Sequence, residues 1–595
     1  MSEVKVNKVS PRSGTTLTIG DSGDTTNIVG TLQNNGSELV GDISSVVAGT
    51  GLSGGGTSGD VTLNSDLLAK QGGTNFTNSL LVGTSSTGTL SSADGNTGVG
   101  IGVFGALTTG DNNVAVGLNA LDVNTTGAEN VAVGMGALDT NTTGAGNISI
   151  GCGSMSANVS GNYNVAIGRC ALDTSVSGSA NVAIGDRALY TNTASYNTSV
   201  GFFSLAANTT GETNVAVGQN SLAANTTGAR NTGIGQNALL VNTTGANNTA
   251  VGQGALEANT TASDNAAFGH DSLVANTTGT QNSAYGYRSL PANTTGTQNT
   301  AVGHQALGAN TTGGANVGIG FGSMEANTTG TSNLGIGYCA LTTNTTADNN
   351  TAVGPFAMRV TTTGTGNVGI GRSALLDNTT GFGNVAIGCG ALDTNTAGEV
   401  NVAIGCRSMD ANTSGNCNTF VGKDAGLSNT VGFRNTGIGI KAGENVTTGD
   451  QNVFLGFESG AQGGMVNITT EDNRLVAGHS LITNSYVKVD WTVTSDLRDK
   501  TNFGTVPHGL DFVNQLQPVS FQFRTARGED TTNGGVRYGF KAQDILALEK
   551  ANGGSNVIID DEFEECLKLT GGTLLPVLVN AIKELKAEIE LLKNK

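Results

Sequence analysis

Bulky and charged side chains are scarce in this sequence. Aromatic residues make up 5% and charged residues 12% of its 595 residues, with only 6 prolines and one tryptophan against 91 glycines. So few large side chains cannot fill several ordinary globular cores. Hydrophobic residues still account for 37% of the chain, which argues against disorder, where apolar content is low and charge is high. We therefore expect a regular fold with a thin core.

Basic patches and long apolar runs are also missing. The formal net charge of -18 leaves no basic stripe that could neutralise phosphates, so we expect no nucleic-acid binding. The opening MSEVKVNKVSPRSG lacks the apolar core of a signal peptide, and no stretch of about 18 apolar residues occurs. We expect neither membrane insertion nor export by a cellular secretion route.

The cysteines form no recognisable framework. They are odd in number and show no C-x-x-C spacing, so the sequence predicts neither a disulfide framework nor a zinc site, and we expect no metal and no cofactor. We interpret them as small buried apolar side chains in a reducing compartment. The seven are Cys152, Cys170, Cys339, Cys389, Cys406, Cys417 and Cys566.

A 17-residue phrase organises most of the chain. The pattern N-x-A-V-G-x-x-A-L-x-x-N-T-T-G-x-x recurs from about residue 96 to 460. Its marker glycine, the G of A-V-G, runs from Gly100 to Gly456 in 22 copies, separated by twenty intervals of 17 residues and one of 16. A fixed period of this length is typical of a repeat architecture. Positions within a repeat are counted below from the marker glycine.

Each repeat predicts a short strand, an interior column and a turn. The alternation of Val or Ile with Ala, as in residues 214–218, is typical of a strand with one larger and one smaller apolar face. Position +4 is Leu or Met in every repeat from Leu121 to Met409, as expected for side chains stacked in an interior. Asn at +7 and Gly at +10 favour a turn. Coils stacked at about 4.7 Å would form a parallel β-solenoid or β-roll.

Three surface features of the repeats leave alternatives open. The Ala faces should be half exposed in one chain and buried against partner chains in an oligomer. The N-T-T segments could bind glycans on a host surface, form an ice-binding threonine lattice, accept N-glycans, or serve only as turns. Cys389 and Cys406 occupy +1 of adjacent repeats, where stacking as small hydrophobic side chains is favoured over a functional thiol pair.

The shaft and the N-terminal segment each resemble known fibre proteins. The run N-x-A-x-G-x-x-A/S-L resembles the head repeats of trimeric autotransporter adhesins, which are left-handed parallel β-rolls around a threefold axis, and the resemblance implies a homotrimer. Those repeats are generally shorter, so the N-T-T-G-x-x portion departs from their pattern. Residues 1–95, with the phrase TLTIGDSGDTTNIVGTL, resemble segments of bacteriophage tail fibres that join the fibre to the virion. A β-rich cap that protects the first coil is the alternative.

The composition changes after Gly456, where the only tryptophan and helical patterning appear. The segments NRLVAGHSLITNSYVKVDWTVTSDLRDKTNFGTVPHGLDFVNQLQPVSFQFR, VRYGFKAQDI and LLPVLVNAIKELKAEIELLKNK resemble the intramolecular chaperone, auto-processing domain that ends endosialidase-type tailspikes and phage tail fibres. We therefore expect four regions. They are an N-terminal attachment or capping region (1–95), the β-solenoid shaft (96–465), a β connector (466–494) and an α+β chaperone domain with a C-terminal coiled coil (495–595).

The resemblance implies a catalytic Ser-Lys dyad. The family motif S-D-x-R-x-K maps onto Ser495 and Lys500. A serine hydroxyl needs a base, and a lysine serves as one only when burial or nearby cations lower its pKa. Ser495 would attack the carbonyl of Thr494, and water would hydrolyse the resulting ester, so the chain is cut between Thr494 and Ser495. We expect an intramolecular serine endopeptidase that acts on no external substrate.

Local charges and a nearby histidine leave the details of the dyad open. Arg498 would disfavour a charged lysine, whereas Asp496 and Asp499 would oppose that effect. His508, which follows Pro507, is interpreted as a surface loop residue rather than as a general base. A surface depolymerase is disfavoured, because the repeats show no carboxylate pair of the kind that glycoside hydrolysis uses.

The last helix carries an apolar seam at alternating spacings of three and four, typical of a coiled coil. Its residues are Leu575, Leu578, Ile582, Leu585, Ile589 and Leu592. The family resemblance implies three strands. Stacked coils have many near-equivalent registers, so a terminal domain that trimerises first would set the register. Cleavage would then leave the shaft kinetically trapped.

The sequence thus predicts a mainly β, homotrimeric viral tail fibre or adhesin of phage type, part of the virion and assembled in host cytoplasm. Its expected partners are copies of itself, a host cell-surface receptor with glycans among the candidates, and baseplate or tail proteins. The alternative is a purely structural spacer fibre with a non-cleaving trimerisation domain.

Overall fold

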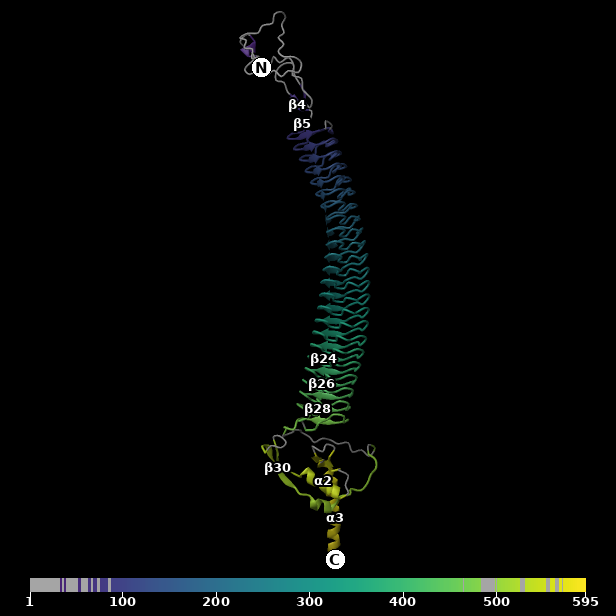
Figure 1. Cartoon of the computed structure of the whole chain (residues 1–595), viewed down its shortest axis with the longest axis vertical. Coiled ribbons are helices and arrows are strands. Elements are labelled where there is room, and N and C mark those ends of the chain that lie inside the picture. The colour runs from purple at the N-terminus through teal and green to yellow at the C-terminus, as the bar shows by residue number, and fades with distance from the viewer. Residues whose placement is uncertain are drawn as a thin grey trace, which may run out of the picture. The chain divides into compact units, whose positions relative to one another are not determined.

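The computed structural model describes residues 75–83, 87–463, 465–482, 498, 500–524, 530–552, 557–561, 567–569 and 571–595, together with five short strands nearer the N-terminus. The chain divides into two compact units, residues 1–146 and 147–595. Both contain stacked coils with one short strand each, and the second also contains the helices (Figure 1). Within the described residues, no helix is long and apolar enough to cross a bilayer.

The first unit begins with short antiparallel pairs and continues as parallel coils. β1 pairs with β2, β3 with β4, and β5 with β6, all antiparallel; from β6 to β9 the pairing is parallel and in sequence order. The strands are β1 (Gln33–Asn34), β2 (Ser37–Glu38), β3 (Leu52–Gly54), β4 (Leu63–Ser65), β5 (Leu68–Gln71), β6 (Leu80–Val82), β7 (Thr97–Val99), β8 (Val114–Val116) and β9 (Val131–Val133).

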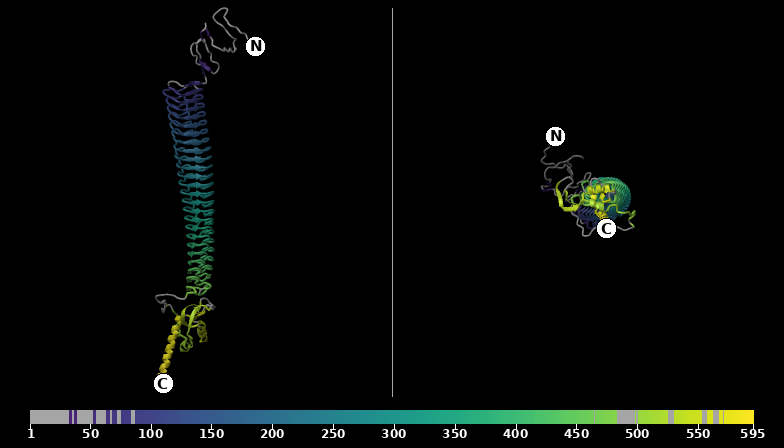
Figure 2. Two further views of the ribbon diagram at one scale, coloured as in Figure 1. Left: turned by 90° about the vertical axis from the view of Figure 1, so that its left-hand side faces the viewer. Right: turned by 90° about the horizontal axis from the view of Figure 1, so that it is seen from below.

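The second unit continues the same design, and its strands pair in parallel and in sequence order from β10 to β29, mostly with a register of 17 residues. Seen from below, its coils lie over one another (Figure 2). The strands are β10 (Ile148–Ile150), β11 (Val165–Ile167), β12 (Val182–Ile184), β13 (Thr198–Val200), β14 (Val215–Val217), β15 (Thr232–Ile234), β16 (Thr249–Val251), β17 (Ala266–Phe268), β18 (Ser283–Tyr285), β19 (Thr300–Val302), β20 (Val317–Ile319), β21 (Leu334–Ile336), β22 (Thr351–Val353), β23 (Val368–Ile370), β24 (Val385–Ile387), β25 (Val402–Ile404), β26 (Thr419–Val421), β27 (Thr436–Ile438), β28 (Val453–Leu455) and β29 (Leu475–Ala477).

The predicted parallel solenoid of 17-residue repeats is confirmed. The parallel pairing also extends one strand beyond each end of the expected range of 96–465, since β6 pairs with β7 and β29 with β28. The last coil is longer, because 22 residues separate Val453 from its partner Leu475.

The interior of a coil is a mixed column of small, aliphatic and amide side chains. In the coil of Gly218, Ala216 at the strand centre and Leu222 at +4 are fully buried. Asn225 at +7 and Asn231 before the next strand are also fully buried. The Leu and Met column at +4 is therefore interior, as the sequence predicts.

The orientation of the strand is the reverse of the expected one. Alanine at the strand centre is completely buried within a single chain, as in Ala216 and Ala250. The Val and Ile residues on either side of it point outward and are partly exposed. The expectation of half-exposed Ala faces is wrong, because the coil is so narrow that only a methyl group fits between its strand and the Leu column.

Glycine at the marker position is a steric requirement. Its φ lies near +135° in most coils, for example +127° at Gly218 and +134° at Gly235. A Cβ added to Gly218 would lie 2.6 Å from the carbonyl oxygen of Gly235 in the next coil. Both the backbone conformation and the close approach of successive coils exclude a side chain here.

Leucine at +4 adopts an unusual backbone conformation. Leu222 has φ of 52°, in the left-handed region that costs a non-glycine residue about 1–2 kcal/mol. The backbone is held there because Leu222 N–H donates to Ala238 O at 2.9 Å, and Asn225 N–H donates to Leu222 O at 3.1 Å. Burial of the side chain offsets the strain.

The C-terminal part of the second unit forms a small α+β domain with a core of its own. Its elements are α1 (Leu510–Gln515), β30 (Val519–Arg524), β31 (Thr532–Gly539), α2 (Ala542–Ala551), β32 (Ile559–Asp560), β33 (Lys568–Leu569) and α3 (Gly571–Lys593). β30 and β31 form an antiparallel hairpin. The core residues come from α1, from α2, from β32 with the residue before it, and from the first turns of α3. They are Phe512, Ile545, Ile558, Ile559, Leu574 and Val577.

Candidate functional site

The predicted cleavage site is only partly within the described residues. Thr494 and Ser495 lie outside them. Lys500 is described; it is exposed and precedes α1 by ten residues. The structure therefore does not bring the two members of the predicted dyad together or separate them. No cluster of three or more histidine, cysteine or acidic residues that could hold a metal occurs in the described part of the chain.

Helix α3 fixes the segment that follows the predicted dyad. Glu584 Oε2 accepts the N–H of Leu510, at the start of α1, at 2.6 Å. Asn580 Nδ2 donates to the carbonyl oxygen of His508 at 3.0 Å. His508 is 6% exposed and its ring stacks on Phe512 at 4.2 Å between centroids. The interpretation of His508 as a surface residue is wrong, because α3 covers the loop that carries it.

A buried carboxylate fixes β32 in the same domain. Glu549 in α2 is fully buried. Its Oε1 accepts the N–H groups of Val557 and Ile558 at 3.0 and 2.9 Å, and its Oε2 accepts that of Ile559 at 3.1 Å. Three donors satisfy the charge where water cannot reach it. This interaction ties α2 to residues 557–559 and was not foreseen from the sequence.

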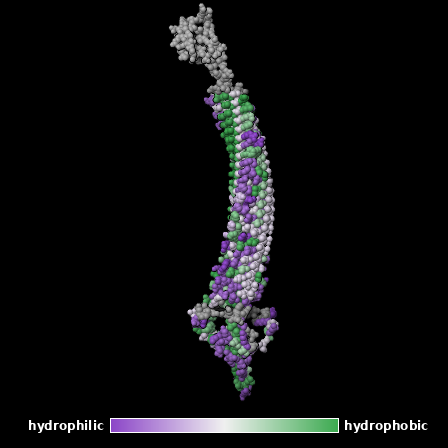
Figure 3. All heavy atoms as spheres, in the orientation of Figure 1, coloured by the Kyte–Doolittle hydropathy of each residue, from purple (hydrophilic) through white to green (hydrophobic). Residues whose placement is uncertain are grey.

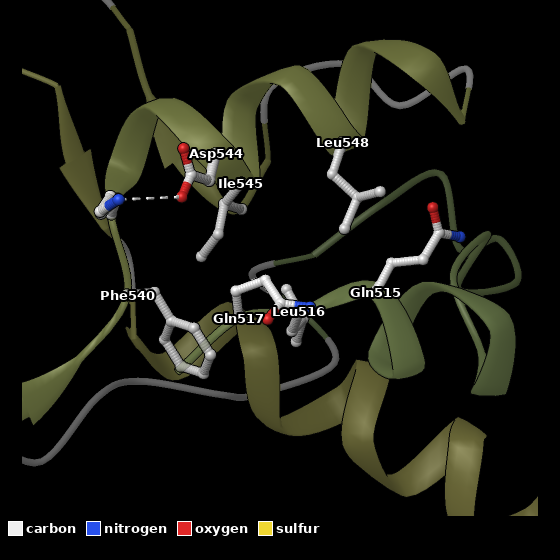
Figure 4. Close-up of a pocket in the computed structure, with 8 residues that line it drawn as sticks. Gln515, Leu516, Gln517, Phe540, Asp544, Ile545 and Leu548 are labelled. Atoms are coloured by element: carbon white, nitrogen blue, oxygen red, sulfur yellow. Dashed lines mark ion pairs between the residues drawn. The ribbon is translucent and has the colours of Figure 1, made fainter. Parts of the chain in front are cut away.

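A small surface pocket lies between the end of α1 and α2 (Figure 4). Leu516, Phe540, Ile545 and Leu548 line it, and Asp544 forms an ion pair with Lys541 at 3.9 Å. Its cavity volume of about 10 Å³ is close to the least that holds one water molecule. It therefore offers no room for a substrate.

The predicted coiled-coil seam is open in the single chain. Ile582, Leu585, Ile589 and Leu592 are between 42% and 70% exposed, while Leu578 is partly buried. The other side of the helix packs inward through Val577 and Ala581. α3 thus uses one face for its own domain and leaves a second apolar face largely exposed within the described chain.

The outward face of the strands is apolar along the whole solenoid. The last residue of each strand is Val, Ile, Phe, Tyr or Leu from β7 to β28, and many of these side chains are more than a third exposed, for example Ile319 and Ile370. We call this column the strand face. Hydrophobic side chains form rows along the coils in the space-filling view, most clearly at the left edge of the upper coils (Figure 3).

The N-T-T segment is a turn with an inward-facing asparagine. Asn225 Nδ2 donates to Gly228 O at 2.9 Å within its turn and to Asn208 Oδ1 at 2.8 Å in the preceding coil. Thr226 Oγ1 donates to Thr243 O in the next coil at 3.0 Å. Only Thr227 is exposed.

This geometry decides among the alternatives for the N-T-T segment. A buried asparagine cannot carry a glycan in the folded protein, so the acceptor interpretation is wrong for these coils. The first threonine bonds to the backbone, so one exposed column remains instead of a two-dimensional threonine lattice. Turn chemistry accounts for the contacts of the segment.

One tract of the shaft carries stacked aromatic rings on its surface. At +1 of five consecutive coils, the rings stack with centroid separations of 5.0–5.5 Å. The residues are His270, Tyr287, His304, Phe321 and Tyr338. Beside them, Phe268 stacks on Tyr285 at 4.9 Å. We call the five residues at +1 the aromatic tract; the sequence signal was a run of ring-bearing residues at one repeat position.

The described cysteines lie at the surface rather than in the interior. Cys152, Cys406 and Cys417 are exposed, and Cys170, Cys339 and Cys389 are partly exposed; none is in a disulfide. The expectation of buried cysteines is wrong, because these residues occupy positions +1, +2 and +12, which lie outside the interior column of +4 residues. Cys566 lies outside the described residues.

The comparison with protein families identifies the end of the chain. Residues 495–553 match the family described as chaperone of endosialidase, a family of autoproteolytic intramolecular chaperones. No curated protein sequence and no solved structure matches the chain. The match to the chaperone of endosialidase family thus lies at the C-terminal end of the chain, after a β-solenoid shaft of about 22 turns, and this architecture is consistent with a tail fibre that has a C-terminal chaperone domain.

Proposed function

We propose that this protein is a homotrimeric tail fibre of a phage-type virion, assembled in host cytoplasm, that attaches the virion to a receptor on the host cell surface. Its C-terminal domain templates the trimer and then removes itself by cleavage between Thr494 and Ser495. The observation that carries the proposal is the joining of a chaperone of endosialidase domain to a long solenoid whose strand face is apolar in coil after coil.

The strand face supports association with copies of the same chain. Large apolar side chains recur on it at every strand from β7 to β28, and an exposed apolar surface of this extent marks an interaction site. A partner that covers it must repeat with the same period. Another copy of this chain meets that requirement, and the open seam of α3 offers a second surface of the same kind.

Charged substitutions on the strand face test this assembly. Changing Ile370, Ile387 and Ile404 to Glu should lower the copy number of the full chain measured by light scattering after size-exclusion chromatography. Changing Thr346, Thr363 and Thr380 to Glu, in exposed turns of neighbouring coils, is the matched control and should leave a trimer. A trimer that survives the first set would reject the strand face as the interface.

Self-cleavage is tested by mass. The wild-type chain of 59.6 kDa should release the peptide from Ser495 to Lys595, whereas Ser495→Ala and Lys500→Ala should remain intact. Lys541→Ala changes another exposed lysine of the domain and should still be cut. Release of the same peptide from the Ser495→Ala chain would reject the dyad, and a wild-type chain that stays intact would favour a non-cleaving trimerisation domain.

The aromatic tract is the proposed place of receptor contact. Its rings occur in a few coils only, whereas a contact between copies repeats along the shaft. Imidazole nitrogens and tyrosine hydroxyls beside apolar ring edges suit a partner with both hydroxyl and C–H surfaces, such as a glycan. Tyr287→Ala with Tyr338→Ala should weaken adhesion to host cells, and Tyr163→Ala, an exposed tyrosine elsewhere on the shaft, should not. Equal adhesion of both variants would favour the spacer fibre.

A further inference from the structure

Two cysteines occupy equivalent surface positions in consecutive coils. Cys389 follows the marker Gly388, and Cys406 follows Gly405. Cys406 is exposed and Cys389 is partly exposed, so reagents in solution can reach both. Neither is in a disulfide, and neither takes part in the proposed cleavage or in the strand face.

Side chains at +1 of adjacent coils contact one another at several places along the shaft. Arg169 and Asp186, both at +1, form an ion pair at 2.8 Å. The rings of Tyr287 and His304 stack at 5.2 Å. Arg372 Nη2, at +1 of the preceding coil, lies 3.5 Å from Cys389 Sγ. The +1 position therefore forms a column of side chains in contact, and Cys389 and Cys406 are neighbours in it.

The backbone holds the two cysteines in register. The residues on either side of Cys406 both donate to the segment that carries Cys389: Gly405 N–H to Ile387 O at 2.7 Å, and Arg407 N–H to Cys389 O at 2.9 Å. Adjacent parallel strands lie about 4.8 Å apart. Disulfides join residues whose Cα atoms are roughly 4.4–6.8 Å apart, so one coil step lies within the range.

Positive groups flank the pair in the same column. Arg372 precedes it and Lys423, at +1 of the following coil, comes after it. The Arg372 guanidinium contacts Cys389 Sγ directly, whereas the ammonium of Lys423 lies 3.7 Å from Asp424. Thiolates are the attacking species in thiol–disulfide exchange, and adjacent cations stabilise them. Cys389 is therefore the expected attacking residue.

We propose that Cys389 and Cys406 form a disulfide within one chain, joining two consecutive coils, when the folded protein meets a thiol oxidant such as glutathione disulfide. The Cys389 thiolate attacks one sulfur of the oxidant, whose S–S bond breaks and releases one glutathione. The Cys406 thiolate then attacks Cys389 Sγ, forms the Cys389–Cys406 bond and releases the second glutathione. The two protons of the cysteine thiols pass to the two glutathione thiolates.

The disulfide would add a covalent link between two coils that are otherwise joined only by noncovalent contacts with adjacent coils. In a solenoid each coil contacts the next and the previous one, and opening can propagate coil by coil. A covalent link across one coil step prevents these two coils from parting. The inference concerns the shaft itself and does not rest on the proposed receptor or on self-cleavage.

Incubation of the folded full chain with glutathione disulfide, followed by peptide mass mapping without reduction, tests the proposal. The expected product is a linked pair of peptides with Cys389 and Cys406, lighter by two hydrogens than the separate peptides. Cys417 is the internal control, since it is also exposed, but Val400 and Arg434 occupy the equivalent positions of the neighbouring repeats. It should carry one glutathione instead.

The Cys406→Ser chain gives a second measurement, in which the glutathione adduct should persist on Cys389. Three results would overturn the proposal. They are glutathione on both Cys389 and Cys406 of the wild-type chain, no reaction at either residue while Cys417 reacts, and a disulfide between two chains, seen as a species of doubled mass on a non-reducing gel.

Discussion

The ring of Phe420 occupies the space that a leucine or methionine fills in most other coils, directly over Gly426. Phe420 stands at a strand centre, where other coils have alanine or another small residue, and Gly426 stands at +4. A Cβ added to Gly426 would lie 2.7 Å from the ring. The pair is thus an exchange of large and small side chains within one coil, which conserves the volume of the interior.

This exchange predicts that the two substitutions correct each other. Phe420→Ala should lower the free energy of unfolding of the local coils by about 3–5 kcal/mol, because it leaves a cavity. Gly426→Leu alone should also destabilise, since the new side chain meets the ring. The double variant restores the Ala and Leu pattern, and Gly426 already has φ of 60°, close to that of Leu222. Hydrogen exchange of the coil amides should show the double variant as more stable than either single one; additive losses would contradict the exchange.

The buried asparagine ladder predicts that the loss in free energy of unfolding caused by a substitution depends strongly on its position within the N-T-T turn. Asn225→Ala removes the acceptor of Asn242 Nδ2 and the donor to Asn208 Oδ1. Each buried amide left without its partner costs about 1–3 kcal/mol. Thr227→Ala, at the exposed position two residues later, should change the free energy of unfolding by less than about 0.5 kcal/mol. Similar losses in both variants, measured by local hydrogen exchange, would place the asparagine in solvent.

Asp393 predicts that the adjacent coils are more stable in mild acid. Burial of its carboxyl group, reinforced by Asp410 and Asp377, raises its pKa from 3.8 to about 6. Because the folded state binds the proton more tightly than the unfolded chain, the free energy of unfolding falls as the pH rises between these two values and is then constant. Opening of these coils, followed by hydrogen exchange, should therefore be rarer at pH 5 than at pH 7 after correction for the intrinsic exchange rate.

Two variants distinguish the contribution of Asp393 to this pH dependence from that of other carboxyl groups of the shaft. Asp393→Asn should remove most of the difference between pH 5 and pH 7 and stabilise the coils at pH 7. Glu325→Gln, at the same +5 position of another coil, should keep the difference at Asp393. Unchanged pH dependence in Asp393→Asn would assign the effect to another group.

The buried Glu549 side chain predicts that its removal strongly destabilises the C-terminal domain. Glu549→Ala leaves the three backbone N–H groups of residues 557–559 without their acceptor, and we expect a loss of about 3 kcal/mol or more. Glu588→Ala on the exposed part of α3 should have almost no effect. Thermal unfolding of the domain within the full chain, followed by circular dichroism of its helices, distinguishes the two; equal midpoints would mean that residues 557–559 are held without Glu549.

Periodicity predicted the architecture well because each interior position has one chemical role. The column at +4 and the glycine at the marker position could be assigned from residue type alone, since Leu or Met recurs at +4 in most coils and only glycine fits the close approach of coils. Which face of the strand points inward could not be predicted in this way. Alternation of Val and Ala distinguishes two faces but does not say which faces inward; that depends on the width of the coil, which the left-handed conformation of residues such as Leu222 sets.

The C-terminal domain was recognisable from its motifs, but its internal contacts were not. The interaction of Glu584 with the start of α1 spans 74 residues of sequence, and no local pattern connects the two ends. His508 was wrongly predicted to lie at the surface for the same reason, because the helix that covers it comes much later in the chain. The surface position of the cysteines could have been found by noting that +1 also accommodates Arg, Asp and Gln, which do not enter a narrow interior.

The amide ladder before each strand has a consequence for how such a shaft changes in evolution. Asn197 N–H still donates to Asn181 Oδ1 at 2.9 Å, although the intervening coil is one residue short. Every coil thus offers the next the same acceptor, and whole repeats can be gained or lost by recombination between near-identical stretches of the gene. The length of the shaft becomes a count of repeats, adjustable in steps of about 4.8 Å, while the chaperone domain at the end needs no change.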